Sequence, residues 1–140
     1  MTTEQIQKIH WLNRAFHADK RAKALEMKAE HDHNIAERIT RNYSGTGGTA
    51  SGNSTEDALI RLAETERLAQ DELRNLVQIR QEISDAVSSV DDSDMQAILT
   101  LHFLAYETFE EIAEKLNYSR ATIMRKYKKA LDKMILNDTL

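Results

Sequence analysis

The chain has 140 residues, of which 41% are hydrophobic and 30% are charged, and its formal net charge is −4 at pH 7. This composition is typical of a water-soluble helical protein with one domain or two small ones, and four glycines without any proline favour long helices. The lack of cysteine excludes a disulfide framework, a cysteine-based zinc site and a thiol nucleophile. The polar N-terminus has no apolar signal region, and no segment approaches the roughly 18 apolar residues of a membrane span, so we expect no membrane insertion.

The first predicted helix covers residues 3–43. Apolar or small residues recur there at alternating spacings of three and four, which is the pattern of a helix that buries one seam against a partner helix. Asp32 is the single acidic break in this pattern. The seam consists of Trp11, Ala15, Ala18, Ala22, Leu25, Ala29, Asp32, Ala36, Ile39 and Tyr43.

Residues 44–54 read Ser-Gly-Thr-Gly-Gly-Thr-Ala-Ser-Gly-Asn-Ser and contain all four glycines of the chain. This composition predicts a flexible linker. A phosphate-binding loop is the alternative, and we set it aside because the run lacks the GxxxxGK[ST] spacing and follows no predicted strand.

The second predicted helix covers residues 55–90, and the charges of Glu66 and Arg80 interrupt its heptad pattern. The seam consists of Leu59, Leu62, Glu66, Ala69, Leu73, Leu76, Arg80, Ile83, Val87 and Val90. The simplest arrangement is a coiled-coil-like antiparallel hairpin of the two long helices, although the linker also allows pairing between subunits. Two interrupted seams leave apolar edges uncovered, so we expect a homodimer and assign residues 1–90 to a hairpin and dimerisation region.

Residues 91–140 form the second predicted domain. The acidic segment 91–94 marks its boundary, and Asp92 or Ser93 is placed to cap the helix that follows. That helix, at residues 94–105, has a broad apolar face. The predicted fold is therefore all-α, with a long hairpin followed by a compact C-terminal module.

The C-terminal module has the parts of a helix-turn-helix. Thr108 and Glu111 have the spacing of a capping box, which predicts a short helix at residues 109–116. Asn117 can end that helix in a left-handed conformation, and Ser119 can cap the next helix. A short helix, a tight turn and a second helix together predict a helix-turn-helix.

The last predicted helix, residues 119–134, is basic. The stretch 118–134 contains six Arg or Lys residues and one Asp, so its net charge is +5 and the rest of the chain sums to −9. A buried stripe is predicted at Ile123, Tyr127, Ala130 and Met134. Apart from Asp132, the acidic residues of this helix-turn-helix lie in the two preceding helices, which leaves the last helix as the face that meets phosphate. On charge alone a solvated basic face is the simpler interpretation, but the helix-turn-helix pattern favours a DNA-recognition helix.

The C-terminal sequence resembles region 4 of bacterial sigma factors, which reads the −35 promoter element in the major groove. The matching parts are residues 98–104 (ILTLHFL), residues 108–116 (TFEEIAEKL) and Ser119-Arg120. The whole chain is similar to phage late-gene transcription regulators of Gram-positive bacteria, the ArpU/RinA-like group. That group shares its order of a long helix, a Gly-Ser-Thr linker, a second helix and this module. The chain departs from region 4 at Tyr106 and Asn117, where region 4 usually has Gly, and at His102, where it often has Arg.

Roles in DNA binding can be assigned by position along the last helix. In a helix-turn-helix the first turns of the second helix face base edges, and later positions face phosphates. The residues placed at base edges are Arg120, Ala121, Thr122 and Arg125, since Arg can pair with guanine and the Ala and Thr methyls can contact thymine. The residues placed at phosphates are Ser119, Lys126, Lys128, Lys129 and Lys133. The alternative for Arg120 is a simple ion pair with Glu110 or Glu114.

No enzymatic activity, cofactor or metal is predicted. The five histidines do not converge with carboxylates at ligand spacing, and no HExxH motif occurs. GxSxG, Walker and dinucleotide-binding motifs are also absent from the sequence.

Three functions compete. The favoured function is a sequence-specific transcription regulator of phage or prophage origin that activates late genes and binds double-stranded DNA at the nucleoid of the bacterial host cytoplasm. The second is a sigma-like factor that acts with RNA polymerase, which is less favoured because no aromatic, basic −10-reading domain precedes the module. The third is a coiled-coil assembly or adaptor protein whose basic tail contacts an acidic protein.

Overall fold

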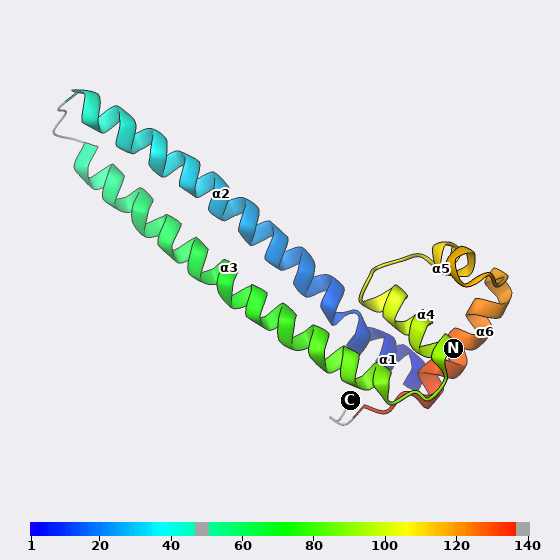
Figure 1. Cartoon of the computed structure of the whole chain (residues 1–140). Coiled ribbons are helices and arrows are strands. Elements are labelled where there is room, and N and C mark those ends of the chain that lie inside the picture. Colours follow the sequence, from blue (N-terminus) through cyan, green and yellow to red (C-terminus); the bar gives the residue numbers. More distant parts are fainter. Residues whose placement is uncertain (47–50, 137–140) are drawn as a thin grey trace. The chain divides into compact units, whose positions relative to one another are not determined.

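The computed structural model describes residues 1–46 and 51–136, and this part of the chain folds into helices without a strand (Figure 1). The helices are α1 (Thr3–Leu12), α2 (Arg14–Thr46), α3 (Ser51–Ser88), α4 (Ser93–Phe103), α5 (Phe109–Leu116) and α6 (Arg120–Lys133). The predicted all-α fold, in which two long helices precede a helix-turn-helix, is confirmed. The long helices extend into both ends of the linker predicted at residues 44–54, whose residues 47–50 lie outside the described part. Within that part, no helix has the length and apolar character needed to cross a bilayer.

The first long helix is interrupted at Asn13, so the prediction of one continuous helix over residues 3–43 was wrong there. The Asn13 N–H donates to the Ile9 carbonyl oxygen at 2.9 Å and closes α1. The Trp11 carbonyl oxygen accepts a hydrogen bond from Arg14 Nε at 2.9 Å, and the Arg14 guanidinium lies 4.5 Å from the centre of the Trp11 ring. A side chain that bonds into the carbonyl ladder of a helix is a common cause of such a break.

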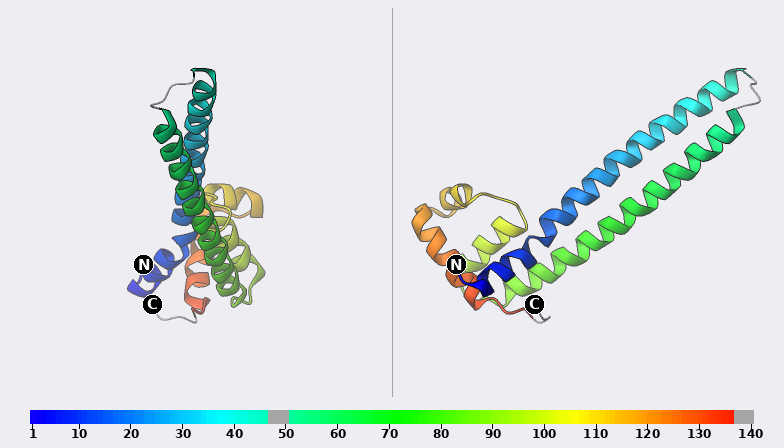
Figure 2. Two further views of the ribbon diagram at one scale, coloured as in Figure 1. Left: turned by 90° about the vertical axis from the view of Figure 1, so that its left-hand side faces the viewer. Right: turned by 180° about the vertical axis from the view of Figure 1, so that it is seen from behind.

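The helices form two compact units, and each is described by itself. One unit comprises residues 18–76, in which α2 and α3 run antiparallel side by side (Figures 1 and 2). The seam predicted for α2 is buried or half-buried along this unit as far as Ile39. Its acidic break is paired, because the Thr65 hydroxyl donates to Asp32 Oδ2 at 2.8 Å and Lys28 Nζ donates to Thr65 Oγ1 at 2.9 Å.

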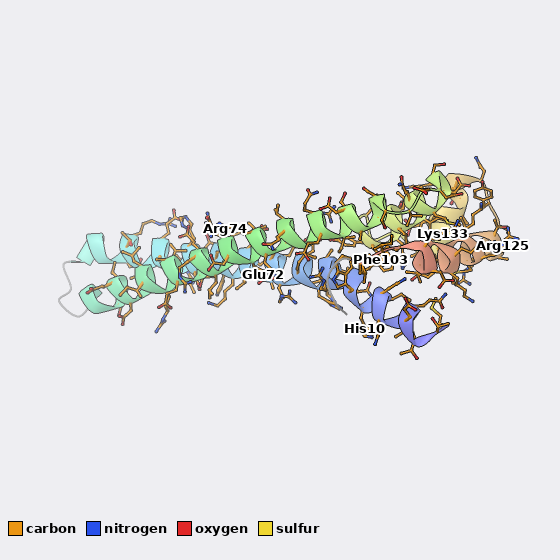
Figure 3. All side chains as sticks on the ribbon, turned by 90° about the horizontal axis from the view of Figure 1, so that it is seen from below. His10, Glu72, Arg74, Phe103, Arg125 and Lys133 are labelled. Atoms are coloured by element: carbon orange, nitrogen blue, oxygen red, sulfur yellow. The ribbon has the colours of Figure 1, made fainter. Side chains whose placement is uncertain are left out.

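The seam of α3 in this unit differs from the prediction. At every second seam position, the buried or half-buried residue is the one just before the predicted residue. Leu59 and Leu73 are 51% and 38% exposed, and Glu66 is exposed as well. The buried or half-buried residues are Thr55, Ala58, Leu62, Thr65, Ala69, Glu72 and Leu76. The prediction favoured the largest apolar side chains, whereas the alanine-rich seam of α2 permits a close approach that small residues on α3 accommodate better. Glu72, labelled in Figure 3, pairs with Arg21 of α2 at 3.0 Å.

The other unit comprises residues 1–17 and the described part of 77–140. In it α6 packs against α4, α5 and α1 (Figure 2). Its largest buried side chains are Leu12, Ile79, Ile83, Val90, Met95, Ile98, Leu99, Phe103, Ile112, Ile123, Tyr127, Leu131 and Met134. Residues 1–17 and 77–90 thus pack in the same unit as the C-terminal helices. The predicted division of roles between residues 1–90 and 91–140 stays a prediction.

Replacement of Thr65 by valine is expected to destabilise the protein at neutral pH. Valine keeps the shape of the side chain, but Asp32 loses the hydrogen bond that holds the pKa of its carboxyl group below the ordinary value of 3.8. Stability from a lowered pKa is present above the ordinary value and is lost as the pH falls through the folded-state pKa. The melting temperature of the variant, followed by circular dichroism, should therefore lie below that of the wild type at pH 7 and approach it as the pH drops below 3.8.

Thr40→Val is the control for this experiment, because among the described residues the exposed Thr40 hydroxyl bonds only to the Ala36 carbonyl oxygen of its own helix. The control should shift the melting temperature little and by the same amount at each pH. The same pH-independent shift in both variants would contradict a role for Asp32.

Candidate nucleic-acid interface

Polar side chains fix both ends of α4. Asp92 caps its start, and Arg80 bonds to the loop that follows it. Asp92 caps α4, since its Oδ1 accepts from the Met95 N–H at 3.0 Å. Beyond the helix, Tyr106 has φ 60°, a left-handed conformation that costs a residue with a side chain roughly 1–2 kcal/mol. Arg80 Nη1 stabilises this loop by donating to the Leu104 carbonyl oxygen at 3.0 Å and to the Tyr106 hydroxyl at 3.2 Å. The charge of Arg80, predicted to interrupt a helix seam, therefore fixes a loop.

α5 and the turn after it have the predicted helix-turn-helix geometry. Thr108 and Glu111 form the reciprocal capping box, in which each side chain accepts from the other residue's N–H at 3.2 Å. Asn117 ends the helix at φ 60° and ψ 41°. Ser119 caps α6, because its Oγ accepts from the Thr122 N–H at 3.1 Å. The caps predicted at Thr108, Asn117 and Ser119 are confirmed.

The apolar stripe of α6 faces the core of the unit. The stripe residues, none more than 3% exposed, are Ile123, Tyr127, Ala130 and Met134. The Tyr127 ring lies 4.8 to 6.1 Å from the rings of His102, Phe103 and Phe109, and burial raises the pKa of Tyr127 to about 12. Because this side of the helix is filled, its other positions are left for the surface.

The residues predicted to meet DNA lie on the outer side of α6 and at its start. The exposed residues are Ser119, Arg120, Ala121, Arg125, Lys128, Lys129 and Lys133, and the half-buried ones are Thr122 and Lys126. Figure 3 labels Arg125 and Lys133 on α6. The Ser119 hydroxyl is engaged within the turn, since it donates to Thr122 Oγ1 at 2.9 Å. The assignment of these residues to base edges and phosphates stays a prediction.

Arg120 is paired with an acidic residue of α5. Its Nε lies 3.1 Å from Glu110 Oε1, and the two side chains are 63% and 64% exposed. The ion pair considered as an alternative from the sequence is therefore present, with Glu110 as the partner. An exposed pair of this kind contributes little to stability and is screened by salt. The contact uses Nε, so both terminal NH₂ groups of Arg120 can still donate to another acceptor.

A second acidic contact joins α6 to the start of α4. Asp94 Oδ2 accepts a hydrogen bond from the Tyr118 hydroxyl at 2.6 Å and lies 3.4 Å from Lys126 Nζ. The Tyr118 hydrogen bond and then the Lys126 charge hold the pKa of Asp94 below its ordinary value. The cations of α6 that form no ion pair with any described residue are Arg125, Lys128, Lys129 and Lys133.

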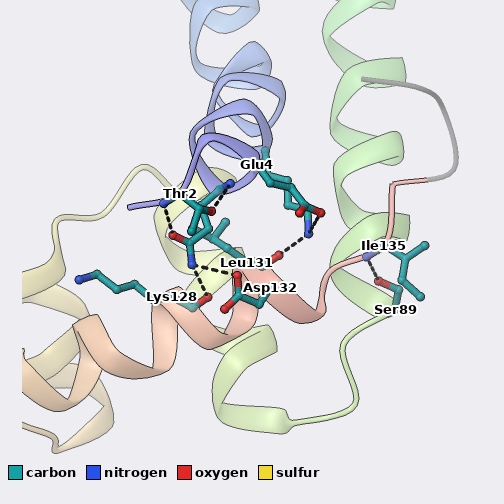
Figure 4. A network of polar contacts seen from close by, with 9 residues as sticks. Thr2, Glu4, Ser89, Lys128, Leu131, Asp132 and Ile135 are labelled. Carbon is teal, nitrogen blue, oxygen red and sulfur yellow. Dashed lines mark hydrogen bonds and ion pairs between the residues drawn. The ribbon is translucent and has the colours of Figure 1, made fainter.

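The contact between α1 and the end of α6 was missed by the sequence analysis. Gln5 and Lys8 are 7% and 6% exposed, and both donate to groups in the last turn of α6 (Figure 4). A signal was present, because Gln5, Lys8, Leu12 and Ala15 recur at alternating spacings of three and four. The polar character of the first two residues concealed it, since a hydrophobic pattern counts polar residues against a buried face.

Acidic side chains near α6 serve as helix caps and ion-pair partners. Asp92 is a cap, and Glu110 and Asp94 hold cations of α6. Among residues 1–46 and 51–136, no three His, Asp or Glu side chains gather as a candidate metal site.

The three C-terminal helices define a helix-turn-helix domain of the kind found in DNA-binding transcription proteins. Residues 92–134 match the family model of Sigma-70, region 4, which agrees with the predicted resemblance to region 4 of sigma factors. The match spans α4, α5 and α6, and α1, α2 and α3 lie outside it. Searches among curated proteins and among solved structures found no match to the chain.

The two left-handed residues, Asn117 and Tyr106, are expected to respond differently to glycine. Asn117→Gly removes the cost of the left-handed backbone but raises the conformational entropy of the unfolded chain. Because these two effects nearly cancel, the free energy of unfolding should stay within about 0.5 kcal/mol of the wild type. Tyr106→Gly also loses the hydroxyl contacts to Arg80 and Ala15 and the ring contact to Phe16 at 5.4 Å. It should therefore lower the free energy of unfolding by about 2 kcal/mol in urea titrations. A stabilised Tyr106→Gly variant would show that these contacts contribute nothing.

Proposed function

We propose that this protein is a sequence-specific DNA-binding transcription regulator that places α6 in the major groove. The observation that carries the proposal is the exposed basic side of α6, which belongs to a helix-turn-helix whose residues 92–134 match Sigma-70, region 4. The phosphate contacts of its cations would supply most of the affinity through counterion release. Side chains in its first turns would supply the sequence preference.

Base contacts are assigned to the first turns of α6. Arg125 is exposed and has no ion-pair partner among the described residues, so its guanidinium can pair with guanine O6 and N7. Arg120 can offer its terminal NH₂ groups while Glu110 holds Nε. Ala121 and the methyl group of Thr122 suit a thymine methyl.

Phosphate contacts are assigned to the helix start and to the later turns. The residues are Ser119, Lys126, Lys128, Lys129 and Lys133. Lys128, Lys129 and Lys133 are exposed and form no ion pair with a described residue, so they can meet phosphate directly. Lys126 would exchange Asp94 for a phosphate oxygen, and this exchange makes its contribution smaller.

In this proposal the regulator acts as a homodimer through its helical hairpin, residues 1–90. The support is a set of apolar side chains of α3 that stay 38–51% exposed, namely Leu59, Ile60, Leu68 and Leu73. Leu59 and Leu73, 14 residues apart, share one side of α3, and a second copy packed there could remove their apolar surface from water. One small module supplies only a low affinity for a specific DNA site. Two helix-turn-helix domains bound to two half-sites would raise that affinity.

We also propose that the protein is of phage or prophage origin and that it activates late genes. Its support is the order of segments along the chain, in which a long helix, a Gly-Ser-Thr stretch and a second long helix precede the region 4-type domain. That order resembles the ArpU/RinA-like group of late-gene regulators. The proposed site of action is the nucleoid in the cytoplasm of the bacterial host, without enzymatic activity.

A sigma-like factor that works only with RNA polymerase is the second candidate. The match to Sigma-70, region 4 favours it directly. The two functions differ in one measurable property, because a regulator binds its operator alone and a sigma-like factor requires the polymerase.

Substitutions at Arg125 and Lys129 should separate sequence reading from phosphate binding. Arg125→Ala should lower discrimination at one base pair by about 1–3 kcal/mol, while Lys129→Ala should weaken binding to all duplexes alike and reduce the salt slope by about one. Electrophoretic shifts with specific and unrelated duplexes at several salt concentrations measure both effects. Arg74→Ala, which removes an exposed cation of α3, is the charge control. Identical changes in the Arg125 and Lys129 variants would refute the assigned roles.

Selection of bound fragments from random DNA with the purified protein should enrich a palindromic motif of two half-sites. Binding should also weaken steeply as salt is raised. Enrichment of a single half-site only when RNA polymerase is added would favour the sigma-like factor. Binding without any sequence enrichment would favour an adaptor protein with a basic tail.

A further inference from the structure

α1 closes the C-terminal end of α6, although α1 lies outside the segment that matches Sigma-70, region 4. The contact is formed by Gln5 and Lys8, which are almost completely buried. Burial of an amide and an ammonium group costs free energy unless both groups are bonded. Their partners therefore indicate what the two residues do.

Lys8 replaces a backbone donor that α6 lacks at its end. In a continuing helix the Leu131 carbonyl oxygen would accept from the Ile135 N–H, but that N–H donates to Ser89 Oγ at 3.0 Å. Lys8 Nζ donates to the Leu131 carbonyl oxygen at 2.8 Å, and Glu4 Oε1 lies 3.6 Å from the same ammonium group (Figure 4). A cation at this end of a helix also stabilises the helix dipole.

Gln5 holds the adjacent groups of the same turn. Its Nε2 donates to Asp132 Oδ1 at 2.9 Å and to the Lys128 carbonyl oxygen at 3.5 Å. Its Oε1 accepts from the Thr2 N–H at 2.9 Å, and Thr2 Oγ1 accepts from the Gln5 N–H at 3.1 Å. The Gln5 side chain is thus part of the N-terminal cap of α1 and is fixed from both sides.

We infer that Gln5 and Lys8 are positioning residues for the phosphate contacts of the second half of α6, an inference that rests on the proposed function. The cations assigned to phosphates there, Lys128, Lys129 and Lys133, lie in the same turns of α6 as the groups that α1 holds. Those held groups are the Lys128 and Leu131 carbonyl oxygens and the Asp132 carboxylate. α1 therefore sets the direction of the end of α6, and with it the reach of these cations. Gln5 and Lys8 are buried and do not touch DNA themselves.

The test compares two leucine substitutions on the same helix. Gln5→Leu removes the contact to α6, and Gln7→Leu changes an exposed residue that bonds to no described side chain. Both changes are neutral, so neither alters the charge that DNA encounters. Gln5→Leu should weaken binding to the selected DNA site about fivefold to tenfold and lower the slope of log affinity against log salt by about one, which corresponds to one lost phosphate contact. Gln7→Leu should bind like the wild type.

Lys8→Met is the second variant, because it keeps the length of the side chain and removes the donor to Leu131. It should change the salt slope as Gln5→Leu does. All titrations are run well below the measured melting temperature of each variant. If Gln5→Leu does not fold at the assay temperature, Gln5→Asn, whose shorter amide cannot reach Asp132, replaces it with the same expected result.

Amide hydrogen exchange of the free protein adds a measurement that does not depend on DNA. Gln5→Leu should speed exchange in the last turn of α6, residues 130–134, and Gln7→Leu should not. Faster exchange together with unchanged DNA affinity and salt slope would overturn the inference, because the contact would then serve only the fold. Unchanged exchange and unchanged binding would overturn it as well. A wild-type protein without salt-dependent DNA binding would refute the proposed function, and the inference with it.

Discussion

The burial of one side of α6 is the constraint on which the arrangement of the C-terminal unit depends. Ile123, Ala130 and Leu131 are completely buried, and α4, α5 and α1 all pack against this helix. Lys and Arg are almost never buried without a partner. Because the apolar residues occupy the inner side, the cations of α6 are left on the outer side. The hydrophobic effect within the protein, and not attraction to DNA, therefore orients the basic surface before any ligand arrives.

Acidic neighbours make the cations of this surface unequal. Arg120 and Lys126 each have a carboxylate within 3.4 Å, whereas Arg125 and Lys129 have none among the described residues. An anion at Lys126 must compete with Asp94, whereas an anion at Arg120 meets the two terminal NH₂ groups that Glu110 leaves open. The exposed pair of Arg120 is weak and is screened by salt. The surface thus combines cations that form no ion pair with a described residue and cations that already hold a carboxylate.

The hairpin unit shows how a helix pair can bury polar residues and expose apolar ones. Thr65 and Asp32 satisfy each other inside the seam, with Lys28 as a third member. Leu59 and Leu73 lie outside that seam and stay partly in water. The small residues Ala58, Thr65 and Ala69 in the seam of α3 suit a close approach to the alanine-rich face of α2. The exposed leucines are the surface on which the proposed homodimer depends.

The sequence by itself determined the features that depend on residues close together in the chain. The Thr108 capping box, the left-handed Asn117, the Ser119 cap and the buried stripe of α6 each involve neighbours within a few positions or one repeating period. The outward placement of the predicted DNA-binding residues follows from the same period.

Only the tertiary structure decided which distant groups meet. Arg80 bonds to a carbonyl group 24 residues away, and Gln5 bonds to a carboxylate 127 residues away. The register of the α3 seam likewise depends on how closely α2 approaches. The spacing of Gln5 and Lys8 marks a buried face of α1 but does not say which distant groups that face meets, because one hydrogen bond between distant segments fixes a single pair of atoms and leaves no repeat at its partner. The local chemistry of α6 could therefore be predicted, and its attachment to α1 could not.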